Sequence, residues 1–201
     1  MTNPPSSLWR EGVKMFRRRL RTGVVALVVL GAAVASCSPA ATAAPGATSY
    51  QEFRPAFCSA WEALFRAVGN PDTGAGSDLS KALDAAIAAG DQAAVERAAT
   101  AIAAELADAH RQSAFAAGWQ PAAPMMAEMD RLIAAYDAGL AAQRTVAGQG
   151  SQAATALRQS AFEKAGGLDA WQAMFSAVNL IGAALPAGQA AQPCANVPIS
   201  I

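Results

Sequence analysis

Apolar side chains recur every three or four residues through most of the chain after residue 50, and this spacing constrains the fold most strongly. It places the apolar residues on one face of an α-helix, whereas a half-buried strand would require alternation. Ala, the strongest helix former, dominates the same region. The sequence therefore predicts an all-α domain over residues 49–201, a four- or five-helix bundle with an irregular C-terminal tail.

Glycine, proline and capping residues indicate where the helices begin and end. Pro55 suits a first turn better than a helix interior, so the first helix is expected to begin there, with an earlier turn from Ser49 as the alternative. An interruption is expected at Gly166 and Gly167. Short connections predict that neighbouring helices are antiparallel. The predicted helices span residues 55–68, 78–89, 92–117, 124–147 and 151–185.

The first 36 residues have the three parts of a secretory signal: a basic region, an apolar core and small residues. Arg17, Arg18, Arg19 and Arg21 precede the apolar run 22–35. That run has 14 residues, whereas a membrane-spanning helix needs roughly 20. An export signal that is later removed is therefore favoured over a permanent membrane helix.

Residues 34–37 read Val-Ala-Ser-Cys. They resemble the lipobox of bacterial lipoproteins, in which an aliphatic residue and two small residues precede an invariant Cys. The resemblance implies that Cys37 carries a diacylglycerol and that residues 1–36 are a cleaved signal peptide. Lipid would then anchor the protein to the outer face of the bacterial cell membrane. An ordinary secretory signal cut near Ala44 is the alternative.

Residues 37–48 separate the lipidation site from the first predicted helix. They are small, uncharged and Pro-containing, so they cannot bury an apolar core. A flexible tether is predicted here, between the anchor and the domain at 49–201.

The formal net charge of zero describes the whole chain and not the mature protein. From Cys37 onward there are nine Lys and Arg against fourteen Asp and Glu, a net charge near −5. Nucleic-acid binding requires an excess of basic residues, so nucleic acid is not an expected partner.

The three cysteines also fit export. Lipidation of Cys37 would leave Cys58 and Cys194, and two thiols in an oxidising compartment are expected to form a disulfide. The alternative is two free thiols in redox or metal chemistry, but the chain has no C-x-x-C pair.

Motifs of catalysis are scarce. His110 is the one histidine, whereas H-E-x-x-H zinc sites and di-iron bundles need two. G-x-S-x-G is absent. Residues 148–153 match a dinucleotide-binding glycine pattern, but a helix is predicted where that motif needs a strand. We therefore expect a non-catalytic binding or scaffolding module with no metal and no required cofactor.

His110 falls near the predicted buried stripe of its helix, and Met125, Met126 and Met129 follow on the next, antiparallel helix. A His and a Met could together ligate haem inside the bundle. The alternative, which we expect, is a partly buried histidine hydrogen-bonded to a neighbour, with the methionines filling the core.

Phe115 and Trp119 gather with the same methionines around a Pro-rich turn. Phe115 points about 180° away from Leu106 on its helix. A small apolar core that closes the end of the bundle is expected here. The alternative is an exposed patch that binds a protein partner or a small apolar ligand.

Overall fold

The structure, a computed structural model, describes residues 46–70, 75–145, 150–185 and Cys194. All of these belong to one compact unit formed by residues 42–201. The predicted signal peptide, the predicted lipidation site Cys37, and most of the predicted tether and C-terminal tail lie outside the described residues.

Six α-helices and one short 3-10 helix make up the described fold, so the all-α prediction is confirmed. One isolated β-bridge, between Asn70 and Ala75, joins the two ends of a loop. The elements are α2 (Tyr50–Val68), α3 (Asp78–Ala89), α4 (Gln92–Ala116), η2 (Gln120–Ala122), α5 (Ala123–Thr145), α6 (Ser151–Lys164) and α7 (Gly167–Ala184).

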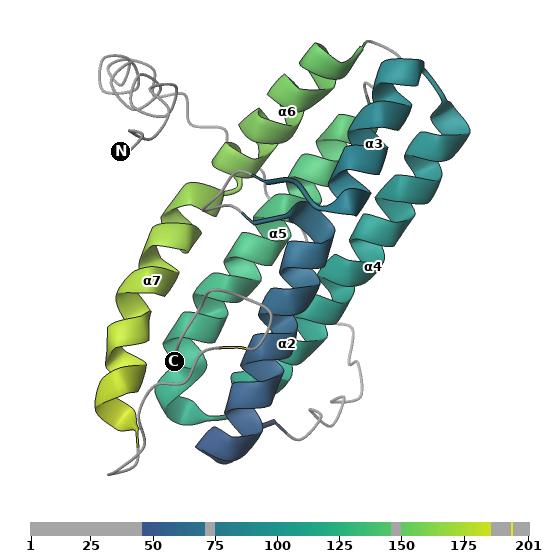
Figure 1. Cartoon of the computed structure of the whole chain (residues 1–201). Helices are drawn as coiled ribbons and strands as arrows, with labels where there is room; N and C mark the ends of the chain where they lie inside the picture. The colour runs from purple at the N-terminus through teal and green to yellow at the C-terminus, as the bar shows by residue number, and fades with distance from the viewer. Residues whose placement is uncertain (1–45, 71–74, 146–149, 186–193, 195–201) are drawn as a thin grey trace, which may run out of the picture. The chain divides into compact units, whose positions relative to one another are not determined.

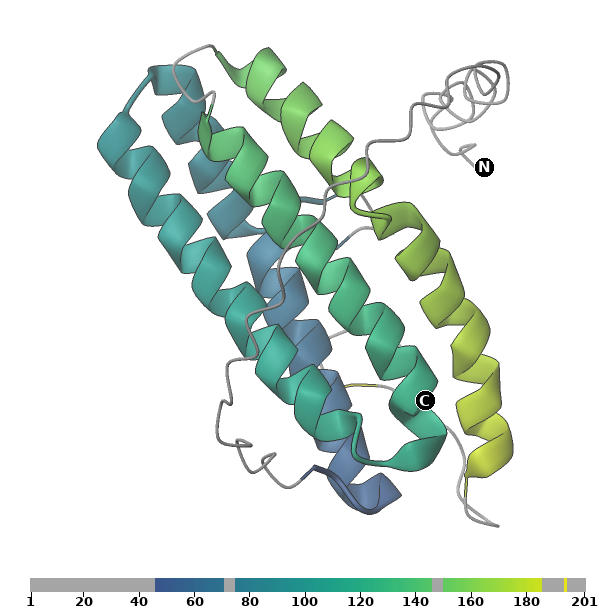
Figure 2. The same ribbon diagram turned by 180° about the vertical axis from the view of Figure 1, so that it is seen from behind.

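The helices stand in four columns (Figure 1). α2 and α3 follow each other end to end and pack along α4, and α6 and α7 do the same along α5. The long helices α4 and α5 lie side by side in both views (Figures 1 and 2). Columns that follow each other are antiparallel, as predicted. Helices that share a column run in the same direction. The antiparallel prediction was therefore wrong for α2 and α3, while α6 and α7 are the two halves of the helix predicted to be interrupted.

The first helix begins at Tyr50 and not at Pro55, so the predicted start was wrong and the alternative turn from Ser49 is correct. The Ser49 side chain accepts a hydrogen bond from the Glu52 amide. The Glu52 carboxylate in turn accepts from the Thr48 amide at 2.7 Å and from its hydroxyl at 2.9 Å. The hydrogen bond from the Thr48 amide, followed by the bond from the Thr48 hydroxyl, lowers the pKa of Glu52. Pro55 is tolerated inside the helix because the carbonyl it leaves unpaired belongs to exposed Gln51.

Residues 46–48, predicted as part of the tether, instead pack on the end of α4. The Ala47 amide donates to the Phe115 carbonyl at 2.8 Å, and the Ala47 side chain is fully buried. A Cβ on Gly118 would lie 2.7 Å from the Gly46 Cα, so glycine is what lets the two backbones meet. The folded domain therefore includes residues 46–48, which the predicted boundary at residue 49 leaves out.

Large apolar side chains from α2 fill the centre of the bundle. Phe53, Phe57, Trp61 and Leu64 share one face of the helix, as the spacing predicts, and each is at most 1% exposed. Each such side chain contributes roughly 1.5–3 kcal/mol on burial. Trp61 also contacts the last column, because its ring centroid lies 5.7 Å from that of Trp171 on α7.

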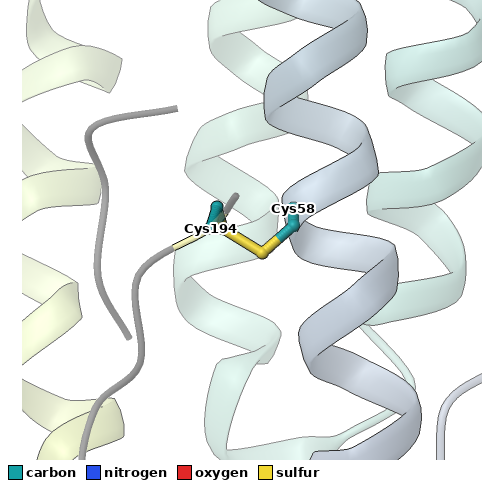
Figure 3. Close-up of a disulfide and its surroundings, with 2 residues drawn as sticks. All are labelled: Cys58 and Cys194. Carbon is teal, nitrogen blue, oxygen red and sulfur yellow. A yellow bond between two sulfur atoms is a disulfide. The ribbon is translucent and has the colours of Figure 1, made fainter. Parts of the chain in front are cut away.

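The predicted disulfide between Cys58 and Cys194 is present, with the two Cα atoms 5.4 Å apart (Figure 3). It fastens Cys194, the one described residue of the C-terminal tail, to the middle of α2. Cys194 is buried in the same core cluster as the aromatic residues of α2.

Candidate functional site

A cavity of about 400 Å³ lies where the first column breaks. The ends of the α2–α3 connection, residues 67–70 and 75–76, form one side of it. Side chains of α3, α4, α5 and α6 form the rest. This volume falls within the range of about 300–1,000 Å³ typical of small-molecule sites.

Close backbone contacts and hydrogen bonds define the break between α2 and α3. Gly69 has a φ of +93°, and a Cβ there would lie 2.2 Å from the Ala75 carbonyl oxygen. The Asn70 amide donates to that same oxygen at 2.9 Å. Ser77 caps α3 and donates its hydroxyl proton to the Ala67 carbonyl at 3.0 Å. The end of α2 and the start of α3 are thereby held on the rim of the cavity.

Three polar side chains from different helices meet on the cavity wall. Gln143 of α5 is 1% exposed, and its amide nitrogen donates to the Asp84 carboxylate of α3 at 3.1 Å. Its amide oxygen accepts from Arg158 Nη1 of α6 at 3.5 Å. The same Nη1 lies 3.5 Å from Asp84 Oδ1. The buried amide thus has both of its ends satisfied, while the two charges remain partly exposed.

Arg158 is held in place by the close approach of its helix to α5. A Cβ at Gly139 would lie 3.1 Å from the Arg158 carbonyl oxygen and 3.3 Å from its Cγ, so α6 rests on the glycine backbone. The hydrogen bond to Gln143 and the ion pair with Asp84 both use Nη1 of the guanidinium. Within the described part of the chain, no group hydrogen-bonds to Nη2 or Nε.

Tyr136 lines the cavity beside Arg158. Its ring packs on Phe162 with centroids 4.7 Å apart. Burial raises the pKa of Tyr136 from 10.0 to about 12, against the opposing charge of Arg158. The hydroxyl is therefore neutral at physiological pH, and no described residue hydrogen-bonds to it.

Ionisation of Tyr136 is expected to destabilise the fold at alkaline pH. Because its folded pKa is the higher one, the stabilisation is complete below pH 10 and is lost as the pH rises towards 12. A shift of this size corresponds to at most about 3 kcal/mol. Urea unfolding at pH 9 and pH 11.5 measures the loss, which should be smaller in Tyr136→Phe; equal losses in the two proteins would contradict the assignment.

The break between α6 and α7 supports this wall. Gly166 takes the left-handed conformation with a φ of +79°, which confirms the interruption predicted there. A Cβ at Gly167 would lie 2.4 Å from the Phe162 ring. The glycine therefore leaves the space that Phe162 occupies when it packs on Tyr136.

His110 and the methionines do not come together as the alternative haem site would require. The His110 side chain hydrogen-bonds to Asp130 at 3.3 Å, as expected, but it is 61% exposed, so its expected partial burial was wrong. Ala109 occupies the buried position instead. Met125, Met126 and Met129 are completely or almost completely buried, as expected of core residues.

The predicted core at the end of the bundle is confirmed in part. Trp119 is buried, with its ring 4.8 Å from that of Phe53 and 5.6 Å from that of Tyr50. Phe115 is 39% exposed and does not join them. It lies at the point where α4 meets residues 46–48, and its backbone carbonyl, more than its ring, makes the contact.

The described ranges were also compared with the requirements of a metal site, a membrane span and a dinucleotide site. They contain no group of three His, Cys, Asp or Glu side chains placed to hold a metal ion. Among them, no helix combines the length and apolar character needed to cross a membrane. The glycine pattern at 148–153 lies partly outside the described residues, and α5 precedes it in place of the strand that a dinucleotide site needs.

Sequence reasoning missed the cavity, because Asp84, Gln143 and Arg158 resemble ordinary surface residues of three separate helices. The one usable signal was Gln143, which falls three residues after Leu140, on the predicted buried stripe of its helix. Comparison with family models, with curated proteins and with solved structures finds no match to this chain.

Proposed function

We propose that this protein is a lipid-anchored, extracytoplasmic binding module that takes up a small molecule in the cavity at the α2–α3 break. The observation that carries the proposal is the cavity wall itself, where Arg158 and Tyr136 present donors without a described partner. Binding sites of this kind combine an apolar lining with a few oriented polar groups. Among the described residues of this wall, no nucleophile is paired with a base, which favours binding over catalysis.

Two features support an extracytoplasmic location. The Val-Ala-Ser-Cys sequence at residues 34–37 supports lipidation of Cys37. The Cys58–Cys194 disulfide supports exposure to an oxidising compartment, because such bonds are rare in the bacterial cytosol. A disulfide-linked bundle attached to a lipid anchor would hold its cavity near the membrane surface.

Cys37→Ser is expected to abolish lipid attachment. In bacteria fed radiolabelled palmitate, the wild-type protein should carry label and partition into the detergent phase of Triton X-114, because two or three acyl chains anchor firmly. The variant should carry no label and keep its uncleaved signal peptide. Ser38→Ala is the matched control and should behave as wild type. Undiminished labelling of Cys37→Ser would refute the anchor.

Filling the cavity is expected to remove a bound small molecule. Ala75 lies exposed on the rim, so Ala75→Trp can project an indole across the opening without disturbing the core. Native mass spectrometry of full-length protein from membranes should show added mass on the wild type and none on this variant. Ala85→Trp, on the exposed face of α3 outside the cavity, is the control. Identical spectra from all three proteins would count against a binding role.

A further inference from the structure

We infer that the ligand of this cavity is a small monocarboxylate with an apolar body, its carboxylate held by Arg158 and the Tyr136 hydroxyl. The inference rests on the proposed function and gives it a ligand class. It follows from three properties of the wall: the donors that lack a partner, the balance of charge, and a lining that combines polar with apolar side chains.

The donors suit a planar acceptor. Arg158 uses Nη1 for Asp84 and Gln143, which leaves its Nε and Nη2 edge to face a ligand. That edge presents two parallel N–H groups whose spacing matches the two oxygens of a carboxylate. Tyr136, on the neighbouring helix, adds a neutral hydroxyl that donates to the same anion.

The charges favour a single negative charge on the ligand. Asp84 offsets Arg158, and Lys81 on the rim is offset by Asp78 at 3.4 Å. A dianion such as phosphate would place its second charge close to Asp84, and like charges at this range repel. A cationic ligand would instead meet the guanidinium. Among anions, a single carboxylate satisfies the free donors with the least repulsion from Asp84.

The lining also has apolar side chains. Val68, Leu83, Ile102 and Leu140 come from four different helices and contribute apolar surface to the cavity. A hydrocarbon or aromatic body placed against them would leave water, while its carboxylate was held by Arg158. The cavity volume of about 400 Å³ suits a body of about the size of one ring.

Three probes that share one body isolate the contribution of the carboxylate. Phenylacetate, phenylacetamide and phenethylamine are titrated by calorimetry into the full-length protein in lipid nanodiscs, with empty nanodiscs as the blank. Phenylacetate should bind saturably and at least about tenfold more tightly than the amide or the amine, because a charge-assisted bond is worth roughly twice a neutral one.

Variants then locate the site. Tyr136→Phe keeps the ring on Phe162 and removes one hydroxyl, so it should weaken phenylacetate about three- to tenfold with no change in the melting temperature at neutral pH. Arg158→Gln should abolish the preference for the acid over the amide. Arg144→Gln, an exposed cation on α5 outside the cavity wall, is the control and should bind as wild type.

Amide or amine binding as tight as that of the acid overturns the carboxylate inference but leaves a binding module standing. The carboxylate inference is likewise overturned, and a binding module left standing, if phenylacetate binds but neither Arg158→Gln nor Tyr136→Phe weakens it. If none of the probes binds, the inference fails. The mass-spectrometric comparison then decides separately whether the cavity holds any other ligand.

Discussion

Replacing Cys58 and Cys194 together by Ser is expected to lower the free energy of unfolding by about 5 kcal/mol. The two residues are 136 positions apart, and chain entropy gives about this value for closing so long a loop in the unfolded chain. In a domain of this size the loss corresponds to a fall of about 10–20 °C in the melting temperature. The effect is large because the bridge links the first helix to the end of the chain.

Thermal unfolding followed by circular dichroism measures this effect. Treating the wild type with a reductant should reproduce the behaviour of the double variant, and the reductant should change nothing further in the variant itself. Cys37→Ser serves as the control for loss of a cysteine outside the bundle. A melting temperature that is the same in the oxidised wild type and in the double variant would show that the bridge does not stabilise the fold.

Trp61→Ala is expected to cost about 3–5 kcal/mol. The side chain is 1% exposed and sits edge-on to Phe57, Phe65 and Trp171, with centroids 5.4–6.2 Å apart. Truncation would leave a void lined by rings that cannot collapse into it. The contact between Trp61 and Trp171 joins the first column to the last. Trp61→Phe keeps part of the ring and should cost markedly less.

A double-mutant cycle separates the contact between columns from the lost burial. Trp61→Ala and Trp171→Ala are measured singly and together by urea unfolding, and a coupling of about 0.5–1.5 kcal/mol is expected for an edge-to-face pair. Phe53→Ala combined with Trp171→Ala is the comparison, since in the described structure no ring contact joins Phe53 to Trp171 or to Trp61. Strict additivity for the Trp61 pair would mean that the columns do not interact there.

Features fixed by local chemistry could be predicted from the sequence. Ser77 before α3, Gly90 after it and Asp91 before α4 each perform the capping role that their residue type favours. The disulfide followed from counting cysteines once Cys37 was assigned to lipid. These inferences needed no knowledge of which helix packs on which.

The errors had two origins: a local capping signal that was given too little weight, and a long-range contact that no local pattern encodes. Pro55 indicates a helix start, but the hydrogen bonds among Thr48, Ser49 and Glu52 begin the helix a full turn earlier. Gly46 lies in a segment that composition alone describes as a tether. Its contact with Gly118 is between backbones of glycines 72 positions apart, and no local pattern encodes such a contact.

The site was least predictable, because its polar residues come from three helices. His110 lies one position away from the buried stripe, so a helical period alone could not separate it from Ala109. Asp84 and Gln143 are 59 positions apart, and each is unremarkable in its own helix. Their meeting depends on how the columns are ordered, and that order is a property of the whole bundle.

That order also bears on how the chain reaches its native state. Columns adjacent in sequence pack against each other, so their contacts close short loops and are expected to form early. The first and last columns meet through the rings of Trp61 and Trp171, 110 positions apart, and through α3 and α6. Among the contacts between columns, this join has the largest loop-closure cost and is expected to form last. The cavity lies along it, so the face proposed to receive the ligand would be completed in the final step of folding.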